Sequence, residues 1–284
     1  MKLIREVARR LWSVCSLMHP VPVLCVLLST AIFALVARYP PHLPTVLRLL
    51  GSMAGIQLAI GALNDYVDLP LDRQAKPWKP LVRGDLRPRT ALLIAAVGLG
   101  AALLLVAPLG LRATMLALLG AGAGIGYDLL LKTTRWSWLP YLVALPLLPI
   151  WVWTTVRGWD ARLLTLYPLG ALLVVSLHLA NTLPDITADT GYGVRGFAHW
   201  LGPRWATRLC WLSAAVSPLL AIVAALAGWA DLRRVLPAAL LALLLSGLAI
   251  GYDARSQRCD WRIFFTLLAA AAVTLGLGWL LALS

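Results

Sequence analysis

Long apolar runs separated by short polar connections make up most of this chain. Each run is close to the roughly 20 residues that an α-helix needs to cross the hydrocarbon core of a bilayer. Three connections, 108–110, 157–160 and 228–231, contain glycine and are short enough for tight turns between neighbouring helices. The pattern predicts nine membrane spans, approximately over residues 11–37, 45–66, 90–109, 112–131, 138–156, 161–182, 204–228, 232–252 and 262–283.

The composition agrees with this pattern. Hydrophobic residues make up 61% of the chain and charged residues 13%, which is typical of a polytopic membrane protein. We therefore predict an all-α fold in a single integral-membrane domain over residues 1–284, in contact with the lipid bilayer. The net charge of +13 could suggest a nucleic acid partner. The basic residues lie in short loops between apolar runs, however, and cannot form the basic surface that nucleic acid requires, so none is expected.

The distribution of basic residues predicts an orientation in the membrane. If the N-terminus is cytoplasmic, that side holds 18 of the 25 Lys and Arg residues and ten of the twelve acidic residues. An excess of Lys and Arg on the cytoplasmic side is the usual rule. We therefore expect the N-terminus and the long polar connections 67–89 and 183–203 in the cytoplasm and the C-terminus outside. The membrane expected is the cell membrane of a bacterium or an archaeon.

Two polar clusters of identical spacing follow the second and the sixth span, 117 residues apart. Each reads Asn-x-x-x-Asp-x-x-x-Asp, and a Gly-Tyr-Asp sequence ends the fourth span (126–128) and the eighth span (251–253). The repetition predicts two four-helix units around a central cavity, with a ninth helix added. Such repeats commonly place a binding site where they meet. The clusters consist of Asn64, Asp68 and Asp72 and of Asn181, Asp185 and Asp189.

Each cluster presents a row of oxygen ligands, because residues spaced by four lie along one face of a helix. Such ligands suit Mg²⁺, which takes few carboxylates and completes its shell with waters and substrate phosphate oxygens. Opposed across a cavity, the two clusters would hold two ions with an anion between them. Asp65 adds a carboxylate one step around the first helix. Pro70 and Pro184 resist a straight helix, so the last Asp of each cluster is expected on a loop or a new short helix.

Basic side chains near the clusters complete a candidate site for a phosphate-containing substrate. A phosphate leaving group is commonly held between Mg²⁺ and Lys or Arg side chains. Taken singly, each basic residue could also serve only to orient the helices, and Tyr127 could line the site or anchor at the interface. The candidate substrate-binding residues are Asn64, Lys76, Lys79, Arg83, Tyr127, Lys132, Asn181 and Arg195. The candidate catalytic residues are Asp65, Asp68, Asp72, Asp185 and Asp189.

These polar stretches resemble the signatures of the UbiA-type intramembrane prenyltransferases. The segment 127–132 resembles a further segment of that family, and the nine-span layout matches over essentially the whole chain. The family usually has arginine at the position of Lys79, and residues 196–200 also depart from its pattern. The first signature corresponds to Asn64-Asp65-x-x-Asp68-x-x-x-Asp72 and Lys79-Pro80-Leu81-x-x-Gly84, and the second to Asp185-x-x-x-Asp189, Gly191 and Leu201-Gly202.

The resemblance implies a helical bundle with a central cavity that opens laterally to lipid. It further implies that Mg²⁺ ions on the two acidic motifs grip a polyprenyl diphosphate. Loss of the diphosphate would leave an allylic carbocation that alkylates an acceptor, often an aromatic quinone precursor. The residues agree with this chemistry, because cations would neutralise the leaving diphosphate while apolar helices exclude water.

We therefore expect a Mg²⁺-dependent prenyltransferase that acts on a polyprenyl diphosphate and a lipophilic or aromatic acceptor. One alternative is an intramembrane terpene cyclase, in which the same ionisation is followed by attack of the prenyl chain on itself. A second alternative is an ion or solute transporter that uses the intramembrane carboxylates. The position of both clusters at one membrane face, beside loops rich in cations, favours a phosphate head group over a transported ion.

Overall fold

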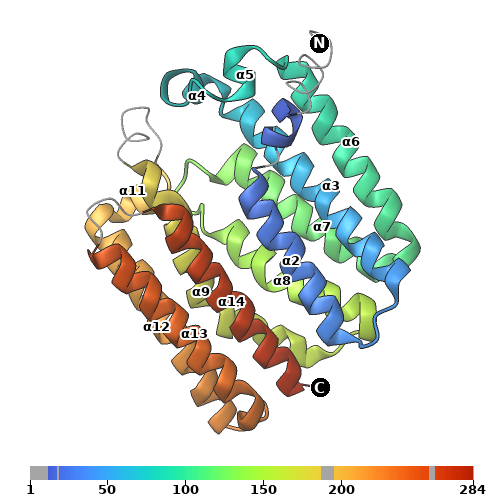
Figure 1. Cartoon of the computed structure of the whole chain (residues 1–284), viewed down its shortest axis with the longest axis vertical. Coiled ribbons are helices and arrows are strands. Elements are labelled where there is room, and N and C mark those ends of the chain that lie inside the picture. The colour runs from blue at the N-terminus through green and yellow to red at the C-terminus, as the bar shows by residue number, and fades with distance from the viewer. Residues whose placement is uncertain (1–11, 18, 187–194, 256–259, 284) are drawn as a thin grey trace. The chain divides into compact units, whose positions relative to one another are not determined.

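The computed structural model of the chain describes residues 12–17, 19–186, 195–255 and 260–283. These residues form helices joined by turns and loops, and no strand occurs among them (Figure 1). Eight of their helices are long and apolar enough to cross a membrane, preceded by a shorter apolar helix, Pro22–Ala37. The predicted all-α membrane fold is confirmed. The eight are Leu43–Val67, Pro88–Leu109, Leu111–Leu131, Leu139–Arg157, Ala161–Thr182, Pro203–Leu226, Leu232–Ala254 and Trp261–Leu283.

The eight helices begin and end within a few residues of the second to ninth predicted spans. The first predicted span, 11–37, includes residues outside the described part of the chain, and its last two thirds form α2 (Pro20–Ala37). The side of the membrane on which each helix ends stays a prediction, because it follows from the counts of Lys and Arg and not from the helices themselves.

The chain divides into two compact units, the first comprising residues 1–32 and 40–130 and the second 33–39 and 131–284. The division near residue 130 matches the predicted boundary between the repeated four-helix units. The cavity expected between them, and a single domain over the whole chain, stay predictions. The first unit contains α3 (Leu43–Val67), α4 (Leu69–Ala75), α5 (Pro80–Arg83), α6 (Pro88–Val106), α7 (Leu111–Gly126) and most of a π-helical turn, η2 (Tyr127–Leu131).

Close packing in the first unit depends on glycine. α3 and α6 cross at Gly55 and Gly98, where a Cβ built on Gly55 would lie 2.5 Å from the carbonyl oxygen of Gly98. A Cβ on Gly98 would likewise lie 2.8 Å from the carbonyl oxygen of Gly55. Small residues at a helix crossing let the two backbones touch, and this is a common way to hold membrane helices together. The crossing fixes α3, whose C-terminal end carries the first acidic cluster.

The second unit packs its long helices around α9, which contacts α8, α12 and α14. Its core includes Leu179 on α9 and Phe264 and Leu268 on α14, all buried. α9 carries the residues that lead into the second acidic cluster, so its packing positions that cluster. The elements are α8 (Leu139–Arg157), η3 (Ala161–Thr165), α9 (Leu166–Thr182), η4 (Leu183–Asp185), α11 (Phe197–Leu201), α12 (Pro203–Leu226), α13 (Leu232–Arg255) and α14 (Trp261–Leu283).

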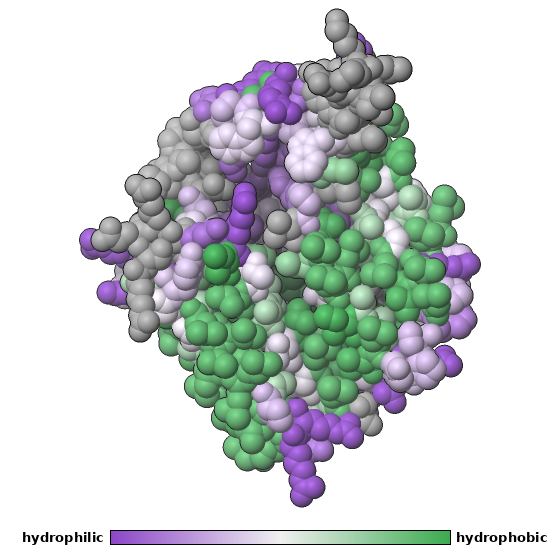
Figure 2. All heavy atoms as spheres, viewed as in Figure 1, coloured by the Kyte–Doolittle hydropathy of each residue, from purple (hydrophilic) through white to green (hydrophobic). Residues whose placement is uncertain are grey.

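Large hydrophobic side chains cover the outer surfaces of the long helices. Leu104 on α6 is 79% exposed, and Leu93 on α6 and Leu244 on α13 are also exposed. Figure 2 shows hydrophobic side chains over the long helices and hydrophilic ones near their ends. Water would penalise so much exposed apolar surface, whereas lipid chains would not, so these faces are suited to a bilayer.

Candidate functional site

The first acidic cluster lies where α3 ends and the chain turns. α3 ends at Val67, Asp68 forms the junction, and α4 begins at Leu69 with Pro70 in its first turn. The prediction that Pro70 ends the straight helix is confirmed, and Asp72 lies on a new helix of seven residues. Because the straight helix ends at Asp68, spacing along an ideal helix no longer determines which carboxylates meet.

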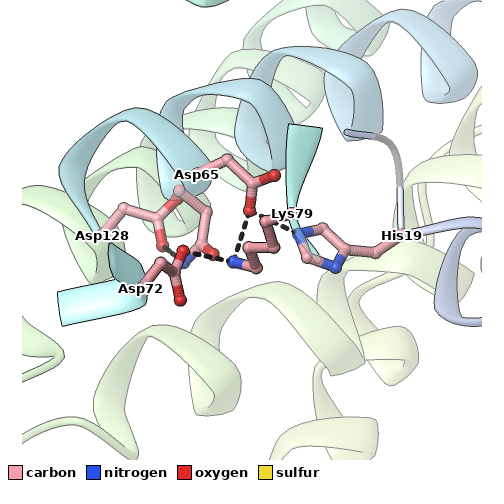
Figure 3. Close-up of polar contacts among 6 residues, drawn as sticks. His19, Asp65, Asp72, Lys79 and Asp128 are labelled. Atoms are coloured by element: carbon pink, nitrogen blue, oxygen red, sulfur yellow. Dashed lines mark hydrogen bonds and ion pairs between the residues drawn. The ribbon is translucent and has the colours of Figure 1, made fainter. Parts of the chain in front are cut away.

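The two carboxylates that meet are Asp65 and Asp72, and the group that joins them is Lys79 (Figure 3). The Lys79 ammonium donates to Asp65 Oδ1 at 2.7 Å and to Asp72 Oδ2 at 2.6 Å. Both aspartates are 2% exposed and the Lys79 side chain is 13% exposed. Asp65 comes from the last turn of α3, Asp72 from α4, and Lys79 directly precedes α5. The site is therefore assembled from three elements.

A small apolar cluster holds α4 and α5 in place. Leu69 of α4 and Leu81 of α5 are buried together with Leu17 and Ala91. Lys79 has extended backbone geometry, and Pro80 follows it at the start of α5 with a preset φ. In the Lys-Pro-Leu sequence, the leucine thus anchors the loop and the lysine points toward the carboxylates.

Burial and the neighbouring charges have opposite effects on the pKa values of the groups in this cluster. Burial alone would lower the pKa of Lys79, but the neighbouring Asp65 and Asp72 carboxylates outweigh it and raise the Lys79 pKa. Lys79 is therefore charged at neutral pH. The pKa of Asp72 is raised, chiefly by burial, although the contact with Lys79 acts in the opposite direction.

Two further side chains lie at this cluster, although the sequence did not place them there. His19 Nε2 lies 3.2 Å from Asp65 Oδ1, and His19 is the one non-glycine residue with positive φ (50°) in the described part of the chain. Asn64 Nδ2 donates to Asp128 Oδ1 at 2.9 Å, and Asp128 is 5% exposed. His19 carries no spacing signal. Asp128 does, because it ends the Gly-Tyr-Asp sequence, and it lies in a π-helical turn, a feature common at functional sites.

The other predicted residues of the first unit lie around this cluster's loop. Asp68 and Lys76 are half-buried at the two ends of α4. Arg83 pairs with Asp85 and is largely exposed. Tyr127 is half-buried at the start of η2.

In the second unit, the segment after the second acidic cluster is fixed by a buried hydrogen-bond network. The Oγ of Ser137 accepts from the Phe197 backbone N–H at 3.0 Å and lies 3.0 Å from His178 Nε2. His178 and Ser137 are 0% and 1% exposed. The ring of Tyr141 meets His178 edge-on, and its hydroxyl accepts from Asn181 Nδ2 at 2.9 Å. His178 therefore has a structural position in α9.

The same network brings two predicted diphosphate-binding segments together. A Cβ on Gly196 would lie 3.1 Å from the carbonyl oxygen of Lys132, so Gly196 packs tightly against the backbone of that residue. Arg195, next to Gly196, is exposed, and Lys132 is half-buried. Asp185 ends η4, and Asp189 lies outside the described residues.

The donor chemistry of the first cluster fits a hard divalent cation. Within the described part of the chain no group of three or more His, Cys, Asp or Glu is placed to hold a metal ion. Mg²⁺ commonly binds one or two protein carboxylates and takes its other ligands from water and substrate phosphates. Asp65 and Asp72 already converge on one cation, the Lys79 ammonium, so their geometry is that of a cation site.

The comparison with known protein families identifies the chain. A model of the UbiA prenyltransferase family matches residues 23–283. This chain belongs to that family. The family predicted from the sequence is thereby confirmed. No curated protein matches the chain.

Solved UbiA structures share the fold at low sequence identity. A UbiA homologue from Archaeoglobus fulgidus bound to GPP and Mg²⁺ is 18% identical, with a TM-score of 0.77 over 96% of this chain and 100% of that one. A UbiA homologue from Aeropyrum pernix K1 is 20% identical, with a TM-score of 0.68 over 92% and 98%. A digeranylgeranylglyceryl phosphate synthase is 14% identical, with a TM-score of 0.68 over 96% and 98%.

Proposed function

We propose that this UbiA-family protein transfers a prenyl group from a polyprenyl diphosphate to a lipophilic or aromatic acceptor of the quinone-precursor type, with Mg²⁺. The observation that carries the proposal is the buried carboxylate–lysine cluster of Asp65, Asp72 and Lys79, which lies in the first of the two stretches that resemble the family's signatures. The Archaeoglobus homologue bound to GPP or to DMAPP, each with Mg²⁺, supports the class of donor.

The acidic residues at the ends of α3 and α9 are the proposed ligands of Mg²⁺. When bound, Mg²⁺ would withdraw charge from the diphosphate and so weaken the bond to the prenyl carbon. The proposed metal ligands are Asn64, Asp68, Asp72, Asn181, Asp185 and Asp189, for two ions, and Asp65 joins the aspartates among them as a catalytic candidate.

The basic residues are proposed to hold the diphosphate as it leaves. Lys79 and Lys76 would do so from the first unit, and Lys132 and Arg195 from the second, where Gly196 keeps their two segments in contact. Fixed cations in a site of low polarity stabilise a developing anion without reorganising during the reaction. Arg83, Tyr127, Asn64 and Asn181 complete the proposed set. The apolar faces of the long helices would accommodate the prenyl chain and keep water from the carbocation.

The decisive experiment is product analysis by mass spectrometry. The purified full-length protein is incubated with geranyl, farnesyl and geranylgeranyl diphosphates, Mg²⁺ and lipid-extract acceptors. We expect a prenylated acceptor whose formation stops when Mg²⁺ is chelated. A cyclic hydrocarbon formed without acceptor would show a cyclase instead. Ion flux in proteoliposomes without any prenylated product would show a transporter.

Replacement of one aspartate in each cluster tests the proposed site. Asp68→Ala and Asp185→Ala should each lower turnover by a factor of about a thousand or more, because each removes a ligand that acts on the leaving diphosphate. Both variants should keep the melting temperature of the wild-type protein within a few degrees. Wild-type turnover in both variants would contradict this assignment of the metal site.

A further inference from the structure

Lys79 occupies the position of a bound cation in the first acidic cluster. Its ammonium contacts one oxygen of each carboxylate, Asp65 Oδ1 at 2.7 Å and Asp72 Oδ2 at 2.6 Å (Figure 3). Both carboxylates are almost fully buried. Two buried carboxylates held this close repel each other unless a positive charge lies between them. Lys79 supplies that charge from within the chain.

The Lys79 side chain is able to move away from the two carboxylates. Its ammonium is a compact charge at the end of a flexible four-carbon stem, whereas an arginine would hold carboxylates with a rigid fork. Lys79 also lies outside the spanning helices, at the N-terminal end of a helix of four residues. Rotation of its side chain therefore requires no movement of α3 or α6.

The contact makes Lys79 a competitor of any divalent ion for these carboxylates. A divalent ion that bridges Asp65 Oδ1 and Asp72 Oδ2 would compete with the Lys79 ammonium for these two oxygens, and the two positive charges would repel each other. Without a diphosphate, displacement would take the partly buried ammonium away from the two carboxylates that it contacts, which is costly. A diphosphate removes that cost, because it offers the ammonium new oxygen acceptors.

We propose that Lys79 is an internal counter-cation that keeps divalent metal off Asp65 and Asp72 until a diphosphate arrives to receive its ammonium. The inference rests on the proposed function, since it assumes that the site takes Mg²⁺ and a diphosphate, and it adds Asp65 to the proposed metal ligands. Metal and diphosphate then bind cooperatively, and each raises the affinity of the other by the same factor. The site thereby loads metal together with the donor.

The test measures metal affinity rather than turnover. Binding of Mn²⁺ to the full-length protein is measured by electron paramagnetic resonance, with and without inorganic pyrophosphate, and corrected for the metal–pyrophosphate complex in solution. Wild-type protein should bind Mn²⁺ weakly alone and about tenfold or more tightly with pyrophosphate. In Lys79→Met, Mn²⁺ alone should bind about tenfold or more tightly than in wild type, because the competing charge is gone.

Two matched variants separate competition from general electrostatics. Arg73→Met removes an equal charge from an exposed residue adjacent to Asp72, and it should leave Mn²⁺ affinity within about twofold of wild type. Lys79→Arg keeps the charge and should keep weak binding of Mn²⁺ alone. Equal gains in Lys79→Met and Arg73→Met would overturn the inference, as would weaker Mn²⁺ binding in a folded Lys79→Met protein.

If Lys79→Met does not fold, the measurement on the wild-type protein still tests the inference. Wild-type affinity for Mn²⁺ that pyrophosphate leaves unchanged would overturn the inference, while product formation could still support the proposed function. Conversely, a protein that binds no Mn²⁺ under any condition and forms no prenylated product would contradict the proposed function itself.

Discussion

The contacts of Asp65 show what the structure adds to the sequence motif that contains this residue. By spacing, Asp65, Asp68 and Asp72 all lie on one side of an ideal helix, but Asp65 and Asp72 would be two turns apart along its axis. The helix break at Asp68 instead sets Asp65 and Asp72 against the same lysine. Lys79 accordingly serves the aspartates directly, which its place in the Lys-Pro-Leu sequence alone did not establish. His19, which contacts Asp65 from 46 residues away, could not be inferred from any spacing.

Ser137 offers a test at the same scale in the second unit. Ser137→Ala removes the acceptor for the Phe197 N–H and the hydroxyl beside His178, both in a buried place. We expect it to lower the free energy of unfolding by about 1–3 kcal/mol. Thr266→Ala is the control, since it removes an exposed bond to the backbone of its own helix and should cost less than about 0.5 kcal/mol. Denaturant unfolding in detergent compares them, and equal losses would mean that the Ser137 network does not hold the segment.

At the scale of elements, prolines and glycines determine the position of the acidic residues at the C-terminal ends of α3 and α9. Pro70 separates α4 from α3, and Pro184 lies in the short turn η4 after α9. Both breaks could be expected from the sequence, because proline resists continuing a straight helix. The crossing of α3 and α6 could not, because glycine is frequent in membrane helices and its presence alone does not show which glycine meets a neighbouring backbone.

The α3–α6 crossing makes a prediction about helix packing. Gly55→Ala should lower the free energy of unfolding by about 1–3 kcal/mol or more, because the new methyl group meets a backbone carbonyl that cannot move aside. Gly122→Ala on α7 is the matched control. A Cβ there meets open space, so the change should be neutral or stabilise the helix by up to about 1 kcal/mol. Thermal unfolding in detergent measures both, and an unchanged Gly55→Ala protein would contradict the close crossing.

At the scale of the whole molecule, the chain combines two compact units with apolar outer faces and one strongly asymmetric distribution of basic residues. The hydropathy pattern located the spans well, because a bilayer imposes a length and a polarity that are visible in any stretch of about 20 residues.

The orientation prediction is open to direct measurement. In a background without the four native cysteines, the exposed residues Arg87 and Arg233 are replaced one at a time by cysteine. An impermeant thiol reagent added to intact cells should label Arg233→Cys and not Arg87→Cys, because the positive-inside bias puts the α5–α6 loop in the cytoplasm. Both should be labelled after the cells are opened. The opposite pattern in intact cells would reverse the proposed orientation.

By itself the sequence determined the membrane class, the boundaries of the long helices, the family and the residue types of the candidate site. These are local properties, since hydrophobic length, proline breaks and signature spacing are all visible within short stretches. Only the tertiary structure decided that Asp65 pairs with Asp72 through Lys79, that Asp128 accepts from Asn64, and that Ser137 joins His178 to Phe197. Those contacts join residues from separate elements, and which of them meet depends on how the helices break and pack, which no single stretch of sequence encodes.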